Sequence, residues 1–253
     1  MAQDLDEIIA RSACYKLLSL AFLPPGAWDV DKLFSGVEKI IRALPEGHQA
    51  VLKPIVEEIP MPQNEPSEHE YTRLFGVGLD ATPYETEYDP LASARKGHRL
   101  ADLLGFYEAF GFRLAHHRKE FPDHIAAELE FMSLLLLKAA HAGGVGKEEA
   151  QAVAEDAAAK FVVDHLAAWG GIFADRIEAS TQDSFYRFAA RLLRGFLIAE
   201  FRLLGVEPLT LAAASPQDPE PLTCPFASEC PEISGWLDRL TKMPRLRVSA
   251  DSA

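Results

Sequence analysis

The 253-residue chain has few cysteines and lacks the short motifs that mark common cofactor sites. Its three cysteines, Cys14, Cys224 and Cys230, are too few and too unevenly placed for a small disulfide-bonded domain, which favours a reducing compartment. The sequence contains no Gly-x-Gly-x-x-Gly or Gly-Lys-Ser/Thr motif, which argues against a standard nucleotide-binding loop. We therefore expect no resident cofactor and no metal site.

Basic residues and long apolar runs are also scarce. There are 25 Lys and Arg against 38 Asp and Glu, a formal net charge of −13 that argues against a nucleic-acid partner and suits a positively charged one. The longest apolar run near the N-terminus, Leu17 to Leu23, is far shorter than the roughly 20 residues that span a bilayer. The first residues are acidic, unlike a secretory signal. We expect a cytoplasmic protein without stable membrane insertion.

Strand-like alternation is nearly absent, and apolar residues recur with helical spacing instead. This pattern predicts an all-α fold, a single helical domain of about eight to ten helices in residues 1–205. Glycines near residues 143–146 predict a weak division into two lobes, and a kink or short break is expected at Trp169-Gly170-Gly171. Residues 206–253 are predicted to form a proline-containing tail with a short helix.

The first informative stretch is Glu70-Tyr71-Thr72-Arg73-Leu74-Phe75, followed by Pro83-Tyr84-Glu85-Thr86-Glu87-Tyr88. Ser67 and Glu70 have the spacing of a helix-capping box, and Tyr71, Leu74 and Phe75 then form one apolar stripe on the predicted helix. Such a stripe usually packs in the core, so Leu74 and Phe75 can be core residues as well as candidates for binding. Residues 76–94 are predicted to form a loop. Because carboxylates outnumber cations here, we expect an acidic, aromatic surface that suits arginine side chains.

The second informative stretch is Pro122-Asp123-His124-Ile125, which opens another predicted helix. Asp123 is the expected N-cap, and His124 is expected near solvent in the first turn. Neither stretch has the spacing of a metal site or of a nucleophile with its base.

The two stretches resemble the paired motifs of the TorD/DmsD/NarJ family of molybdoenzyme maturation chaperones. A third stretch, residues 161–166 with Trp169 and Phe173, resembles a late helix of that family, so the likeness covers about residues 5–205. It implies a cytoplasmic chaperone, not an enzyme, that binds the twin-arginine signal peptide of an apo molybdopterin oxidoreductase subunit. Such a chaperone holds the catalytic subunit open while its molybdopterin guanine dinucleotide is inserted.

The resemblance and the residue chemistry together give one set of expected client-binding residues. They are Tyr71, Leu74, Phe75, Tyr84, Glu85, Glu87, Pro122, Asp123 and His124. The expected partners are the apo catalytic subunit and its N-terminal signal peptide, and a homodimer is left open. The identity of the client cannot be read from the sequence.

Two other functions remain open at this point. The first is a metal- or redox-active helical protein that uses Cys224 and Cys230, although five residues between the thiols exceed the usual spacing of a zinc knuckle. The second is an enzyme with a helical pocket around Asp123 and His124. A pocket with several convergent polar groups favours an enzyme, whereas an open groove favours peptide binding.

Overall fold

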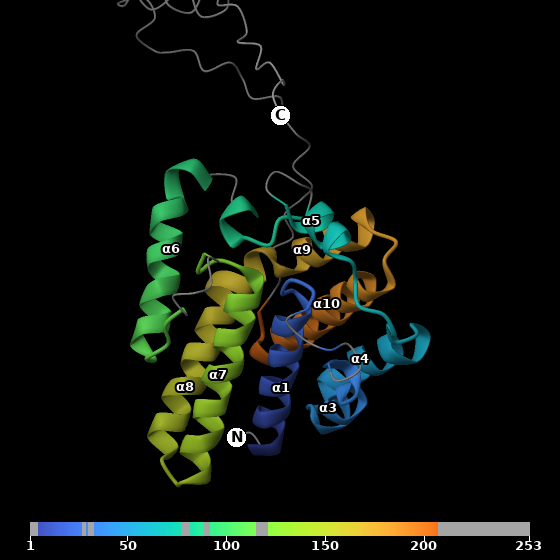
Figure 1. The fold of residues 1–253 in the computed structure, drawn as a ribbon. Coiled ribbons are helices and arrows are strands. Elements are labelled where there is room, and N and C mark those ends of the chain that lie inside the picture. The colour runs from blue at the N-terminus through green and yellow to red at the C-terminus, as the bar shows by residue number, and fades with distance from the viewer. Residues whose placement is uncertain are drawn as a thin grey trace, which may run out of the picture. The chain divides into compact units, whose positions relative to one another are not determined.

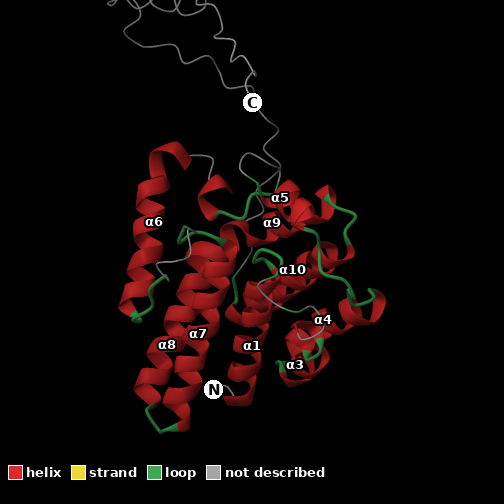
Figure 2. Ribbon diagram, viewed as in Figure 1, coloured by secondary structure: helices red, strands yellow, loops and turns green. Residues whose placement is uncertain are grey.

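The computed structural model describes residues 5–26, 29, 33–76, 81–88, 92–114 and 121–206. These residues form helices, and the one β-type contact among them is an isolated bridge between Tyr84 and His124 (Figure 2). The predicted all-α fold is confirmed. The predicted tail, residues 206–253, lies outside the described residues except for Val206, so its separation from the helical domain stays a prediction. Cys224 and Cys230 also lie outside the described residues.

Figure 1 shows the arrangement of the described elements. In chain order they are α1 (Leu5–Ala21), α3 (Val37–Ala43), α4 (Glu46–Glu58), α5 (Glu68–Phe75), the 3-10 helix η1 (Glu85–Tyr88), α6 (Ala92–Ala109), α7 (Ile125–Gly144), α8 (Glu148–Phe161), the π-helical turn η2 (Val162–Leu166), α9 (Ala167–Ser180) and α10 (Ser184–Leu204). Helix α6 therefore begins at Ala92, inside the stretch of residues 76–94 that the sequence pattern predicted to be a loop.

Local signals fix several helix ends. The Ser67 hydroxyl accepts the Glu70 N–H at the start of α5, at 3.1 Å, as the capping-box spacing predicts. Asp183 caps α10 by accepting backbone N–H groups from Phe185 and Tyr186. At the other end of α10, Gly205 has a φ of 65°, the left-handed conformation that glycine adopts at little cost.

The core is built around α1, which packs along α7, and around α10, which packs on α9 and α4. Ser12 and Ser19 face α7 and donate their hydroxyl hydrogens to the carbonyls of Ser133 and Ala126, both at 2.8 Å. Buried hydroxyls are thereby satisfied inside an otherwise apolar contact. Gly195 allows α4 to approach α10, since a Cβ there would lie 2.6 Å from Ile55 Cδ1.

The break predicted at Trp169-Gly170-Gly171 is wrong, because α9 runs through these residues without interruption. Gly170 has a packing role instead. A Cβ at that position would lie 2.6 Å from Leu197 Cδ1 on α10, so the small residue permits close contact of the two helices. The irregular turn lies earlier, at η2, where the helix widens before α9 begins.

A fully buried ion cluster joins α1, α4 and α10. Glu200 accepts two hydrogen bonds from the Arg11 guanidinium, both at 2.7 Å, one from the Tyr15 hydroxyl at 2.9 Å, and contacts His48 Nε2 at 2.7 Å. Burial alone would raise the pKa of Glu200, but the Arg11 charge and these hydrogen bonds outweigh it and lower the pKa to about 2. The carboxylate therefore stays ionised inside the core.

Glu200→Gln should destabilise the protein at neutral pH by roughly 3 kcal/mol, because it leaves the buried Arg11 without its counter-ion. A carboxyl with a pKa of about 2 in the folded chain contributes stability above its unfolded pKa. That contribution is lost as the pH falls from about 4 toward 2, so the variant and the wild type should converge there. Urea unfolding at pH 7 and pH 3 measures both values.

The matched control is Glu38→Gln, which removes an exposed pair with Arg42 on α3. Exposed pairs contribute about 0–1 kcal/mol, so this variant should differ little from wild type at either pH. A Glu200→Gln deficit that is the same at pH 7 and pH 3 would contradict the assignment.

Candidate functional site

The two signature stretches meet in space. Tyr84 and His124 form an antiparallel bridge, with the Glu85 N–H donating to the Asp123 carbonyl at 2.9 Å and the Ile125 N–H donating to the Pro83 carbonyl at 2.8 Å. Residues 81–88, expected as a loop, are thus fixed against the start of α7. The bridge places side chains from both stretches in one neighbourhood.

Asp123 is not the N-cap of α7, as the sequence pattern predicted. Its side chain is buried, and Oδ2 accepts hydrogen bonds from the Thr86 hydroxyl at 2.6 Å and the Thr86 N–H at 3.3 Å. A capping aspartate would bond to its own helix, whereas this one bonds to a segment 37 residues away. The two Thr86 donors thus satisfy the buried Asp123 carboxyl group, which would be costly to bury without hydrogen bonds.

His124 takes the capping role and is also buried, which corrects the expectation of an imidazole near solvent. Its Nδ1 accepts the Ala126 N–H at 3.1 Å. The ring packs edge-on against Tyr84, with 5.3 Å between ring centroids. His124 therefore caps the first turn of α7 and packs against the ring of Tyr84.

Glu85 does not contribute to an acidic surface, because its side chain is 3% exposed. Both carboxylate oxygens contact His165 Nδ1, at 3.1 and 3.2 Å, and Oε1 lies 3.5 Å from Arg99 Nε. His165 belongs to η2, and Arg99 donates to the carbonyl of Asp164 in the same turn at 3.0 Å. Glu85 and η2 are thus linked both directly and through Arg99.

Glu128 is not among the expected client-binding residues, yet it belongs to this region and has no exposed surface. Its Oε2 accepts a long hydrogen bond, 3.4 Å, from Trp169 Nε1, and Oε1 has no hydrogen-bond partner among the described residues. Burial, followed by the charges of Glu85 and Asp123, raises the pKa of Glu128 well above its usual range. A protonated carboxyl is the form that such surroundings favour.

We call these side chains the buried polar group. Its members are Glu85, Thr86, Asp123, Glu128, His165 and Trp169. Only Glu85 and Asp123 were expected to bind the client. Thr86, His165 and Trp169 lie in the stretches that carry the family resemblance, but their spacing indicated no role for them. Among the described residues no cluster of His, Cys, Asp and Glu has the geometry of a metal site.

Three more accessible side chains lie next to the buried polar group in the same two chain segments. They are Tyr84, Phe121 and Pro122, and we call them the aromatic edge. Phe121 is 59% exposed, and its ring lies 6.1 Å from that of the half-buried Tyr84. Glu87, on the following turn, is exposed and pairs with Lys96 at 3.0 Å. Of the predicted site residues, Tyr84, Glu87 and Pro122 are therefore within reach of a ligand here.

The α5 residues of the predicted site belong to a different aromatic cluster. Leu74 and Phe75 are buried, and the Phe75 ring packs against Tyr186 at 5.2 Å and Phe173 at 6.0 Å. Tyr71 is half-buried and lies 5.0 Å from the Phe75 ring. Leu74 and Phe75 are core residues, as their helical stripe predicts.

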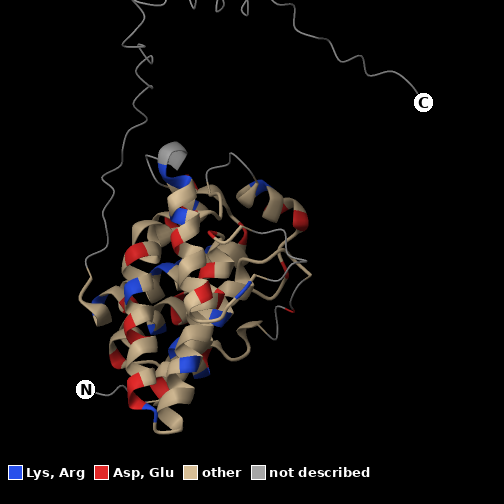
Figure 3. Cartoon of the chain, turned by 90° about the vertical axis from the view of Figure 1, so that its left-hand side faces the viewer, with Lys and Arg blue, Asp and Glu red and all other residues tan. Residues whose placement is uncertain are grey.

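The expectation of an acidic surface needs correction in one further respect. Glu70 accepts two hydrogen bonds from Arg73 and another from Thr181, which lower its pKa to about 2 although partial burial opposes this. Acidic and basic segments are interspersed along the helices on the side shown in Figure 3. The predicted carboxylates are thus largely paired within the fold.

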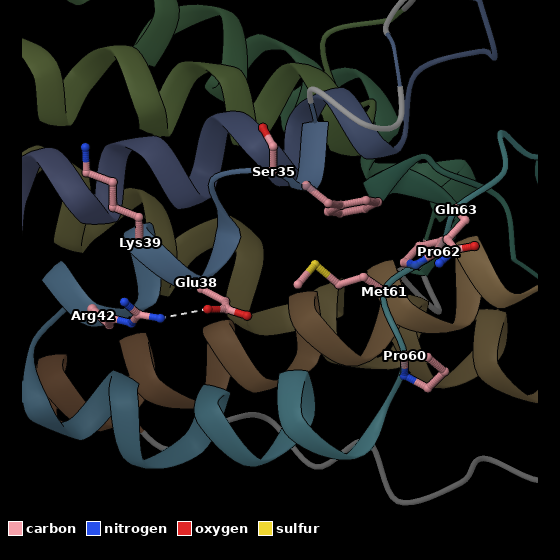
Figure 4. A pocket seen from close by; sticks show the side chains of 9 residues that line it. Ser35, Glu38, Lys39, Arg42, Pro60, Met61, Pro62 and Gln63 are labelled. Carbon is pink, nitrogen blue, oxygen red and sulfur yellow. Dashed lines mark hydrogen bonds and ion pairs between the residues drawn. The ribbon is translucent and has the colours of Figure 1, made fainter.

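A separate open hollow of about 600 Å³ lies between α3 and the connection after α4 (Figure 4). Phe34 and Met61 provide its apolar wall, and the Glu38–Arg42 ion pair, 2.7 Å long, stands at its side. It contains none of the predicted site residues.

Comparison with known proteins shows which family contains this site. A family model described as nitrate reductase delta subunit matches residues 41–175, which contain the whole buried polar group and the aromatic edge. The chain belongs to this family. The resemblance inferred from the paired signatures is confirmed.

Two curated relatives extend the comparison. The chain is 36% identical over 146 residues to the chlorate reductase assembly chaperone protein of Ideonella dechloratans, a match that covers 56% of this chain and 72% of that protein. It is also 36% identical over 128 residues to the selenate reductase assembly chaperone protein of Thauera selenatis, a match that covers 49% of this chain and 62% of that protein.

No helix in the described part of the chain is both long and apolar enough to cross a membrane.

Glu128→Gln should flatten the pH dependence of stability. A carboxyl with a raised pKa in the folded chain contributes most below its unfolded pKa of about 4.3, and the contribution is lost as the pH rises through the folded pKa. The free energy of unfolding of the wild type should thus fall relative to the variant between pH 5 and pH 8. Denaturant unfolding across this range is the measurement.

The control for this experiment is Glu130→Gln, a half-exposed carboxylate on the same helix that pairs with Lys16. Its stability curve should run parallel to that of the wild type. If Glu128→Gln also runs parallel, the Glu128 carboxyl is ionised in the folded protein and its assignment as a protonated group is wrong.

Proposed function

We propose that this protein is an assembly chaperone for the catalytic subunit of a molybdopterin-containing oxidoreductase. It acts in the cytoplasm by binding its client and not by catalysis. The observation that carries the proposal is the similarity to two proteins named as reductase assembly chaperones, together with the family match over residues 41–175, which include the buried polar group. Fold alone would not support a function, but here the similarity and the site coincide.

The proposed client segment is an N-terminal signal with two arginines followed by an apolar stretch. Guanidinium groups stack on aromatic faces and pair with carboxylates, so Tyr84, Phe121 and Glu87 offer suitable contacts. Pro122 would extend the apolar contact at the aromatic edge, and the half-buried Tyr71 would offer a second contact at the separate α5 cluster. Leu74, Phe75, Glu85, Asp123 and His124, also predicted as site residues, would act by holding these groups in place, since they are buried.

The double variant Tyr84→Ala with Phe121→Ala should bind a synthetic diarginine signal peptide at least about 10-fold more weakly than wild type, because aromatic anchors carry a large share of binding energy. Calorimetry at matched protein concentration gives the affinity. The unfolding midpoint should change little, since Phe121 is exposed and Tyr84 is half-buried.

Val153→Ala, an exposed apolar position on α8, is the control and should leave the affinity unchanged. Wild-type affinity in the double variant would show that the peptide binds elsewhere on the protein. No binding by any of the three proteins would reject recognition of a diarginine signal.

A further inference from the structure

One arginine of the chain already reaches the buried polar group. Arg99, on α6, lies with Nε 3.5 Å from Glu85 Oε1 and donates from a terminal nitrogen to the Asp164 carbonyl at 3.0 Å. Its side chain is 30% exposed, whereas Glu85 is almost completely buried. Arg99 therefore enters the group from the solvent side.

The contact between Arg99 and Glu85 is loose by the standards of this protein. Strong charge-assisted hydrogen bonds are about 2.7–2.9 Å long, and the Arg11–Glu200 pair meets that standard with two contacts of 2.7 Å. The 3.5 Å between Arg99 and Glu85 does not. Arg11 is thus a fixed structural partner, whereas Arg99 is held less firmly.

The buried polar group also has unused hydrogen-bonding capacity. Glu128 Oε1 and His165 Nε2 have no hydrogen-bond partner among the described residues. The carboxylate nearest to His165 Nε2, that of Asp102, is 3.6 Å away, which is too long for a hydrogen bond. A guanidinium carries five N–H donors, more than Arg99 uses in its contacts with Glu85 and the Asp164 carbonyl, and carboxylate oxygens are their natural acceptors.

An open hollow of about 650 Å³ lies beside Arg99 on the solvent side. It is lined by Arg95, His98, Arg99, Ala101 and Asp102 on one side of α6. Arg99 and Asp102 belong both to the wall of the hollow and to the contacts of Glu85 and His165. The Arg99 side chain thus stands between the hollow and the buried carboxylates.

We propose that Arg99 is an internal substitute for an arginine of the client, and that a client guanidinium entering through the hollow displaces it from Glu85 and the Asp164 carbonyl. The inference rests on the proposed function for the identity of the client. Arg99 would then lower the apparent affinity of the free chaperone, since the client must compete with it. Replacing Arg99 should strengthen client binding, whereas loss of a simple structural contact would weaken it.

The first experiment tests the guanidinium site without a client. Arg99→Ala should melt at a lower temperature than wild type, and millimolar N-ethylguanidinium should recover part of that loss. Ethylammonium at the same concentration should not, because it lacks the planar donor set. Arg95→Ala, which removes an exposed arginine of the same hollow, should show no such recovery and controls for net charge.

The second experiment measures binding of a diarginine signal peptide by calorimetry. Arg99→Ala is expected to bind the peptide about 10-fold more tightly than wild type, and Arg95→Ala with unchanged affinity. If the alanine variant folds poorly, Arg99→Gln replaces it, with the same expected result. Equal or weaker binding by both Arg99 variants would overturn the inference while leaving the proposed function intact.

The two experiments also separate the two ideas. If no variant, wild type included, binds the peptide, the proposed recognition of a diarginine signal fails, and recovery by N-ethylguanidinium still supports a guanidinium site at Arg99. If that recovery is absent as well, the inference is overturned.

Discussion

The site depends on one buried interaction between segments far apart in the chain, the acceptance by Asp123 of hydrogen bonds from the hydroxyl and amide of Thr86. A buried carboxylate without partners is costly, so this contact and the adjoining backbone bridge must form together. They fix residues 81–88 against the start of α7. Tyr84 is then placed beside Phe121, and Glu85 is turned inward toward His165 and Arg99.

The protein contains two buried carboxylate centres with opposite character. Glu200 has a full set of partners and a lowered pKa, which makes it a structural link between α1, α4 and α10. Glu128 has one long hydrogen bond and a raised pKa, close to the signature residues. Buried groups with incomplete partners are more common at functional sites than in cores, so the second centre is the one we associate with function.

The sequence predicted what depends on local spacing. Helical periodicity gave the all-α fold, and the Ser67 cap and the burial of Leu74 and Phe75 followed from neighbouring residues. The exchange of roles between Asp123 and His124 could not be predicted, because Thr86 lies 37 residues from Asp123 and competes with the helix start for its carboxylate.

Two further features lay beyond local reasoning. Gly170 suggested a break, but its small size serves the contact with Leu197 on another helix. Glu128, His165 and Arg99 each appear unremarkable in sequence, and only the packing of α6, η2 and α7 brings them near Glu85 and Asp123. Long-range polar contacts of this kind leave no periodic signal in a single sequence.

The proposed function requires that the protein hold the catalytic subunit of a molybdopterin oxidoreductase before its cofactor is in place. The direct measurement is purification of the tagged protein from its native host, with identification of the bound chain by mass spectrometry and determination of its molybdenum content. We predict a near-equimolar complex with such a subunit that lacks molybdenum. Recovery of the protein without that subunit, or only with the molybdenum-loaded enzyme, would contradict the claim.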